Sequence, residues 1–356
     1  MSLLAEWEEA RGTSPATLMA TFGVAGWGAA LPERRVTNDD LALTLDTTDA
    51  WIRSRTGIRE RRIGGAGEST GPLAISAARQ ALARARMTAD ELDLVVVATT
   101  TPEQPVPSTA SLVAGALGTS AGAFDLNSAC AGFVYGMVVC GSLIETGAAR
   151  NVLLVGADTL SRTVDPTDRN TAVLFGDGAG AVVLTRDDTP ATGGNGPGGL
   201  VACDLVDDPE ATELLYVKAG GSARPASLET LAAGEHYLRM DGRELFRRAV
   251  RAVSDSVCRT LDTAGCTPDD VDLFVPHQAN ARIIDAVLAR VGLPTERTVQ
   301  TVERHGNTSA ASIPLALSEV AETDELRDGS LVLTTGFGAG LTVGTALLRW
   351  RTSRDS

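Results

Sequence analysis

Residues 87–97 read MTADELDLVVV, and residues 266–276 read CTPDDVDLFVP. Each stretch joins a threonine and acidic residues, which signal the start of a helical turn, to an apolar run that predicts a buried strand. Two further pairs follow in the same order: SACA at 128–131 with SAAS at 309–312, and GDGAG at 176–180 with GFGAG at 336–340. Three pairs in one order indicate two related halves of about 180 residues each.

A turn-rich connection separates the two halves. Residues 187–200 read DDTPATGGNGPGGL, and this density of Gly and Pro is typical of turns. We therefore expect an N-terminal half at 21–190 and a C-terminal half at 191–356. Residues 1–20 would form an N-terminal extension, to which the sequence assigns no role.

Apolar runs and helix-like segments alternate along both halves. Strand-like runs lie at 94–99, 151–156, 181–185, 271–275 and 331–335, and helix-like segments lie at 73–86, 132–146, 243–264 and 310–322. This alternation predicts an α/β fold in which helices cover both faces of each sheet.

Composition and charge exclude several classes of protein. The chain has 356 residues, of which 44% are hydrophobic and 21% charged, the usual balance of a globular protein. Its net charge of -14 would repel nucleic-acid phosphates, so we expect no nucleic-acid partner. No run of about 18 apolar residues and no signal peptide is present, so we expect a cytoplasmic protein without a membrane partner. The five cysteines show no C-x-x-C spacing, so neither a disulfide framework nor a metal site is expected.

Cys130, His277 and Asn307 are the candidate catalytic residues. Cys130 follows a strand-like approach and precedes an apolar helical run, and a helix N-terminus at this position would lower the pKa of its thiol. His277 follows the strand-like DLFVP, at the sheet edge where α/β folds bind ligands. Asn307 lies in the turn that the repeat makes equivalent to the Cys130 turn. Taken singly, each residue more often has a structural role than a catalytic one: a buried thiol, a structural histidine and a turn residue. Together, the three indicate one active site.

The sequence resembles the β-ketoacyl-acyl carrier protein synthase III branch of the thiolase-fold condensing enzymes. The similarity covers almost all of residues 21–350, and the matching stretches are WIRSRTGIRERRI at 51–63, SACAGF at 128–133, DPTDRN at 165–170, FGDGAGAVVL at 175–184, VPHQANARII at 275–284, HGNTSAASIP at 305–314 and GFGAG at 336–340. This resemblance implies a thiolase-like fold whose duplicated halves form a five-layer αβαβα sandwich. It also implies a homodimer and a Cys-His-Asn active site.

The resemblance implies the reaction as well. Cys130 would take an acyl group from an acyl-CoA primer, and decarboxylation of malonyl-acyl carrier protein would then drive a Claisen condensation, in fatty acid or polyketide biosynthesis. The backbone N–H groups of Cys130 and Ala339 would hold the first oxyanion, and His277 and Asn307 would hold the enolate. Acyl-CoA and the acyl carrier protein enter as substrates, and no metal or redox cofactor is expected.

Substrate-binding residues are also implied by the resemblance. Trp51 would stack on the adenine of CoA with Arg169 on its other side, Arg55 would contact phosphate, and Asn280 would contact the pantetheine arm. A set of arginines would help to dock an acidic carrier protein: Arg282, Arg243, Arg247, Arg248 and Arg251. Val106 would reach across the dimer to limit the acyl pocket of the partner, and a residue this small would admit branched or longer primers. Without the resemblance, the arginines of residues 51–63 are a solvated face.

Two other functions stay open at this point. An acyltransferase of the same fold would pass the acyl group from Cys130 to a carrier protein, a hydroxyl or an amine without decarboxylation. A noncatalytic binding protein of this fold is the other alternative, although every implied catalytic position is filled.

Overall fold

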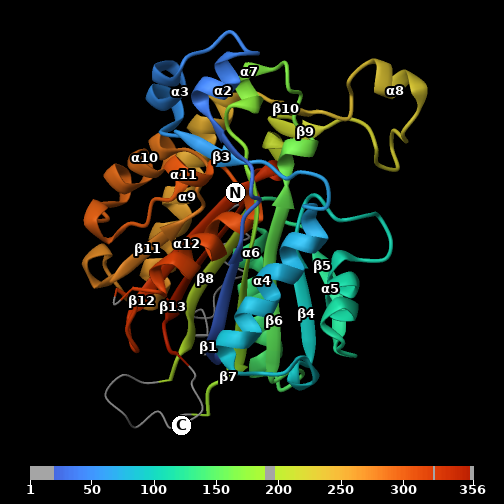
Figure 1. Ribbon diagram of the computed structural model, residues 1–356. Helices are drawn as coiled ribbons and strands as arrows, with labels where there is room; N and C mark the ends of the chain where they lie inside the picture. The colour runs from blue at the N-terminus through green and yellow to red at the C-terminus, as the bar shows by residue number, and fades with distance from the viewer. Residues whose placement is uncertain (1–19, 189–196, 324, 353–356) are drawn as a thin grey trace, which may run out of the picture.

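The computed structural model describes residues 20–188, 197–323 and 325–352. Its nine main strands are hydrogen-bonded in one continuous order, which divides into two sheets where the pairing of neighbouring strands is shortest (Figure 1). The first sheet has the order β1 (Ala20–Ala30), β7 (Asp177–Arg186), β6 (Asn151–Thr159), β4 (Leu94–Ala98) and β5 (Gly122–Leu126), and the second has the order β8 (Gly199–Asp207), β13 (Thr342–Arg349), β12 (Leu331–Gly338) and β11 (Leu273–Pro276). The two sheets meet where Ala20 and Thr21 of β1 pair with β8.

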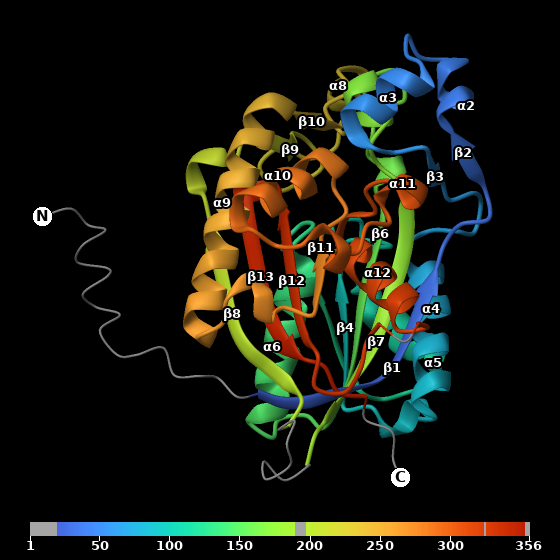
Figure 2. The same cartoon turned by 90° about the vertical axis from the view of Figure 1, so that its left-hand side faces the viewer.

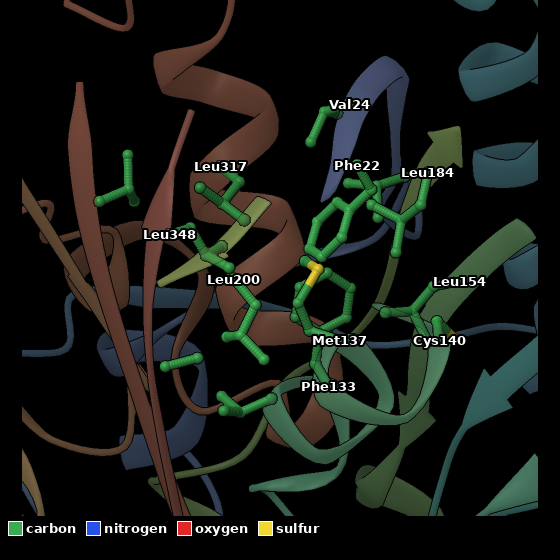
Figure 3. Close-up of a cluster of buried hydrophobic side chains, with 14 of the residues drawn as sticks. Phe22, Val24, Phe133, Met137, Cys140, Leu154, Leu184, Leu200, Leu317 and Leu348 are labelled. Carbon is green, nitrogen blue, oxygen red and sulfur yellow. The ribbon is translucent and has the colours of Figure 1, made fainter. Parts of the chain in front are cut away.

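Six helices complete a sandwich of five layers (Figures 1 and 2). The outer layers are α4 (Thr70–Ala85) and α5 (Thr109–Leu117) on the first sheet and α9 (Gly242–Ala264) and α10 (Ala281–Val291) on the second, and the central layer is α6 (Gly132–Glu145) and α12 (Ser312–Val320). Because α6 packs against both sheets, it is apolar almost throughout, as a helix buried on all sides must be. Figure 3 shows Phe133 and Met137 of this helix among leucines of both sheets. The predicted αβαβα architecture is confirmed.

The two halves repeat one topology. The order β8, β13, β12, β11 matches β1, β7, β6, β4 strand for strand, and a bridge between Thr298 and Phe274 takes the place that β5 has beside β4. The predicted strands and helices coincide with β4, β6, β7, β11 and β12 and with α4, α6, α9 and α12. In both 87–97 and 266–276, a threonine caps a one-turn helix that leads into the strand.

One of the three motif pairs is not structurally equivalent. GDGAG at 176–180 leads into β7, whereas GFGAG at 336–340 ends β12, and β7 corresponds to β13. The glycines recur because both places need a close backbone approach: a Cβ on Gly180 would lie 2.6 Å from the backbone of Pro314, and one on Gly338 would lie 2.5 Å from the backbone N of Cys130.

Short elements gather at one end of the sandwich, above the carboxyl ends of β4 and β6 (Figure 1). They are β2 (Arg35–Thr37), α2 (Asn38–Ala42), α3 (Asp49–Thr56), β3 (Glu60–Arg62), α7 (Arg169–Ala172), β9 (Leu215–Val217), α8 (Leu228–Ala232), β10 (Leu238–Met240) and α11 (Val302–His305). No helix in the described ranges is long and apolar enough to span a bilayer. The predicted boundary near residue 190 and the extension at 1–20, apart from Ala20, lie outside the described residues, so the limits of the two halves stay a prediction.

Candidate active site

Cys130 lies in the turn between β5 and α6, as the sequence predicts. Helix α6 begins at Gly132, two residues further on. Ala129, directly before the cysteine, has a φ of 48°, a left-handed conformation that costs a residue with a Cβ roughly 1 to 2 kcal/mol. Strain of this kind persists where the surrounding structure fixes the backbone, and it aims the Cys130 side chain at the interior.

The expectation of a lowered thiol pKa is wrong for the free protein. Cys130 is only 7% exposed, and burial raises the pKa of its thiol to about 12. The negative charge of Asp158 raises this pKa further, while a hydrogen bond from Ser309 acts in the opposite direction. Burial outweighs the effect of the helix N-terminus because a low-dielectric interior disfavours the thiolate. The resting side chain is therefore a thiol.

His277 directly follows β11, at the predicted sheet edge. Its backbone N–H donates to the carbonyl of Thr335 at 2.7 Å, and the ring packs edge-on against Phe337 with 5.4 Å between centroids. The Nδ1 atom lies 2.6 Å from Ser312 Oγ. Burial lowers the pKa of the His277 imidazole to about 3, so the ring is neutral at physiological pH.

Asn307 is held in its turn by hydrogen bonds at both ends. Its backbone N–H donates to the carbonyl of Leu174 and its carbonyl accepts from Gly176 N–H, each at 2.9 Å. The side-chain Oδ1 accepts the N–H of Ser309 at 2.9 Å. With the oxygen occupied in this way, the amide NH₂ of Asn307 is the end left for a ligand.

Cys130, His277 and Asn307 line one cavity of about 780 Å³. The three come from two turns and a strand end that lie far apart in the sequence, and the structure brings them together as predicted. Phe246 and Phe337 are among the apolar residues of its wall. Shape and lining are those of a small-molecule site, an apolar cleft with a few convergent polar groups.

A second cavity of about 380 Å³ also has Cys130 in its wall. Its wall includes Leu160, Leu238, Ser309 and Ala339, in addition to the cysteine itself. Cys130 thus lines both cavities, as do Phe175 and Leu215, and the larger is called the outer cavity below and the smaller the inner cavity. The predicted oxyanion residue Ala339 belongs to the inner wall, next to Gly338, which touches the Cys130 backbone.

The predicted CoA-binding residues gather at the outer cavity. Trp51, Arg55, Asn280 and Arg282 all line it. The guanidinium groups of Arg55 and Arg169 lie 5.2 and 5.0 Å from the centre of the Trp51 ring, and Arg169 also donates to the carbonyl of Asp46. Asn280 also has a structural role, because its side chain caps α10 by accepting the N–H of Arg282.

The arginines of residues 51–63 do not form one solvated face. Arg61 is fully buried, donates to the carbonyls of Val36 and Val173 and to Asn38, and has its pKa lowered to about 10 by that burial. Of the five arginines in this stretch, Arg55 is the one that lines the outer cavity.

The predicted arginine cluster on α9 is largely neutralised by its neighbours. Arg247 and Arg248 both pair with Glu244, and Arg251 pairs with Asp255. Arg243 lines the outer cavity, as does Arg282, whose guanidinium lies over the Phe246 ring. Of the arginines predicted to dock the carrier protein, these two are the ones that line the outer cavity.

Val106 lies in the loop after β4 and is 81% exposed. It lines neither cavity within this chain. The structure of one chain therefore leaves its predicted contact with a second chain untested.

Sequence reasoning missed three polar residues around the candidate catalytic residues. Ser309 donates to Cys130 Sγ, Ser312 contacts His277, and buried Asp158 accepts the N–H groups of Thr100, Thr101 and Ala310. The two serines belong to SAAS at 309–312, the repeat partner of the cysteine motif, which was the available signal. Asp158 carried no sequence signal, because its partners come from different segments.

Comparison with known proteins decides the family. A curated β-ketoacyl-[acyl-carrier-protein] synthase III from Roseiflexus sp. (strain RS-1) is 49% identical over 334 residues, which are 93% of this chain and 99% of that protein. The chain belongs to the β-ketoacyl-acyl carrier protein synthase III family. Family models described as 3-oxoacyl-[acyl-carrier-protein (ACP)] synthase III and its C-terminal part match residues 124–195 and 261–350.

Solved structures agree with the synthase III assignment. The enzyme from Thermus thermophilus superimposes with a TM-score of 0.85 at 42% identity, covering 93% of this chain and all of that one. A priming β-ketosynthase of the R1128 polyketide pathway superimposes with a TM-score of 0.84 at 36% identity. The match covers 94% of this chain and 97% of that one. The protein is thus a condensing enzyme of the acyltransferase class. Among the described residues, no group of three His, Cys, Asp or Glu side chains could hold a metal ion.

Proposed function

We propose that this synthase III condenses an acyl-CoA primer with malonyl-acyl carrier protein through an acyl group on Cys130. The observation that carries the proposal is the presence of Cys130 in the walls of two cavities, the larger of which is also lined by His277 and Asn307. A nucleophile that borders two chambers can hold an acyl chain in one chamber and receive successive thioesters through the other.

In the first step, the Cys130 thiol adds to the thioester carbonyl of acyl-CoA. The carbon–sulfur bond to CoA breaks, and the thiol proton leaves with the CoA sulfur, so no net proton is gained or lost. The oxyanion needs fixed donors, for which we nominate the N–H groups of Cys130 and Ala339. The inner cavity then receives the acyl chain.

In the second step, malonyl-acyl carrier protein occupies the outer cavity and loses CO₂. The enolate oxygen is held by His277 Nε2–H and the Asn307 amide, and the enolate carbon attacks the acyl carbonyl. Cys130 is released and takes up one proton. Removing one such donor typically costs about 10² to 10³ in rate. The step as written uses protein groups alone.

Trp51, Arg55 and Arg169 form the proposed nucleotide end of the CoA site. The Trp51 ring offers the adenine a stacking surface, and the two guanidinium groups beside it supply positive charge for phosphate. Asn280 and Arg282 lie where the pantetheine arm passes toward Cys130. Arg243 and Arg282, which line the same cavity, are the groups we propose for the acidic carrier protein.

The proposed homodimer forms through β5. This strand is at the edge of its sheet and pairs with β4 alone, and Phe124 on it is 37% exposed. An open edge with an exposed aromatic side chain is a place where a second copy adds its own strand. We propose that Val106, on the neighbouring loop, then limits the acyl pocket of the partner. A reaction that draws on acyl-CoA and a carrier protein fits a cytoplasmic enzyme.

Intact-protein mass spectrometry with a panel of acetyl-, isobutyryl- and hexanoyl-CoA tests the proposal. We expect one adduct that Cys130→Ser abolishes and that Cys258→Ser, which removes an exposed thiol, retains. Adding malonyl-acyl carrier protein should then release CO₂ and give a product two carbons longer. An adduct that moves intact to an acceptor without CO₂ would make the protein a plain acyltransferase, and absence of any Cys130 adduct would reject the mechanism.

A further inference from the structure

Ser312 is a buried serine whose side chain contacts His277. It is 1% exposed and is the first residue of α12. Its Oγ lies 2.6 Å from Nδ1 of His277 and 3.3 Å from the backbone N of Gln278. The hydroxyl does not cap the helix, since no side chain caps the start of α12.

The hydrogen-bonding capacity of these groups settles the direction of the bond. The backbone N–H of Gln278 can only donate, so it uses one lone pair of Ser312 Oγ. The hydroxyl proton then needs an acceptor, and within the described chain the acceptor at hydrogen-bonding distance is Nδ1 of His277. The opposite assignment, with a proton on Nδ1, would leave the buried hydroxyl proton without an acceptor, which costs roughly 1 to 3 kcal/mol.

A neutral imidazole carries one proton on its two nitrogens. If Nδ1 accepts from Ser312, the proton is on Nε2, and Nε2 is a donor. The other tautomer would present a lone pair at Nε2 to the enolate oxygen, and two acceptors would repel each other. One hydroxyl at 2.6 Å thus decides whether His277 attracts or repels the developing charge.

We propose that Ser312 is a positioning residue that holds His277 in the Nε2–H tautomer. Its effect on decarboxylation rests on the proposed function above. Its effect on the tautomer does not, because that follows from the hydrogen bond itself. Ser312 should matter for the malonyl step and not for acylation of Cys130, which it does not touch.

The closing experiment separates these two effects. The chain has three histidines, so ¹⁵N-histidine labelling gives a spectrum that His277→Ala assigns directly. We expect wild-type His277 to show an unprotonated Nδ1 and a protonated Nε2, and Ser312→Ala to lose that pattern. Ser312→Thr, which keeps a hydroxyl, should restore it. Ser318→Ala is the matched control, because Ser318 is a buried serine of the same helix that bonds the carbonyls of Pro314 and Gly28 instead.

Kinetics on the same variants complete the test. In Ser312→Ala we expect the rate of CO₂ release from malonyl-acyl carrier protein to fall about tenfold to a hundredfold, by analogy with the loss of hydrogen-bond partners that orient metal-ligating histidines. The Cys130 acylation rate and the KM for acyl-CoA should stay within about twofold of wild type. A Ser312→Ala spectrum that keeps the Nε2–H pattern would overturn the proposal. If the spectrum changes but the wild type releases no CO₂, the tautomer inference stands and the proposed function fails.

Discussion

The Ser309 hydroxyl donates a hydrogen bond to Cys130 Sγ, with 3.3 Å between the two atoms. Ser309 has a φ of 53°, and its own N–H is held by Asn307 Oδ1. The next N–H, that of Ala310, donates to buried Asp158. One strained turn therefore fixes both the hydrogen-bond donor to Cys130 and the orientation of the Asn307 amide.

Ser309→Ala should reduce the reactivity of Cys130. A hydrogen bond to a charged group contributes about 1.5 to 3 kcal/mol, so losing it should raise the thiol pKa and slow alkylation roughly 10- to 100-fold at a given pH. Mass spectrometry of the Cys130 peptide after iodoacetamide treatment measures the rate. Cys130 of the Ser318→Ala variant should be alkylated at the wild-type rate. An unchanged alkylation rate in Ser309→Ala would contradict the role of the Ser309–Cys130 bond.

Asp158→Asn should change stability and reactivity in opposite directions. The Asp158 carboxylate accepts backbone N–H groups on both oxygens, so an amide NH₂ would have to face one of them, at a cost of about 1 to 3 kcal/mol. Removing its negative charge should also lower the raised pKa of Cys130. We expect an earlier urea midpoint together with faster alkylation of the folded protein.

The control for this variant is Asp93→Asn. Asp93 also accepts two backbone N–H groups, those of Arg150 and Asn151, but it is exposed and belongs to no part of the site. Both N–H groups donate to one oxygen, Oδ2, whose place an asparagine amide oxygen can take, so this replacement should leave both stability and alkylation close to wild type. Equal alkylation rates in both variants would exclude an electrostatic effect of Asp158 on the thiol.

His277 should make the protein less stable as the pH falls below 6.5. The imidazole pKa is about 3 in the folded chain and takes its ordinary value of 6.5 in the unfolded chain, so between these values the unfolded chain binds a proton that the folded chain does not. The stability is fully present above pH 6.5 and is lost on acidification at about 1.4 kcal/mol per pH unit. Urea unfolding at pH 7 and pH 5 measures how much unfolding free energy is lost on acidification. This loss should be about 2 kcal/mol larger for wild type than for His277→Gln. Parallel profiles would show that the folded imidazole takes up protons freely.

Gly338→Ala should abolish acylation of Cys130. A Cβ at this position would lie 2.5 Å from the Cys130 backbone N and 2.6 Å from the Ala129 Cβ, so the nucleophile turn would have to move. Overpacking of this kind typically costs about 1 to 3 kcal/mol. Adduct formation with acyl-CoA and the thermal midpoint are the measurements. Gly115→Ala in α5 is the control, since a Cβ there meets nothing within 4 Å and a helical alanine should leave the midpoint unchanged or raise it.

The sequence by itself determined the duplicated α/β fold and predicted the three residues, Cys130, His277 and Asn307, that line one cavity. Helix starts such as Thr88 and Thr267, and the apolar runs behind them, are local patterns whose meaning does not depend on distant residues. Two equivalent halves also require that the Cys130 turn and the Asn307 turn occupy matching places. The predicted equivalence of GDGAG and GFGAG is wrong, because a glycine indicates only that another group approaches the backbone closely. Such close approaches occur at many unrelated places in a packed protein.

Tertiary structure alone decided the chemical state of these residues. The high pKa of Cys130 and the low pKa of His277 are consequences of burial by segments from both halves. The hydrogen bonds from Ser309 and Ser312 join atoms that are 179 and 35 residues apart in the chain. The energy of a charge or a proton depends on the groups within a few ångströms of it, and those neighbours are chosen by folding, so no local pattern can specify them.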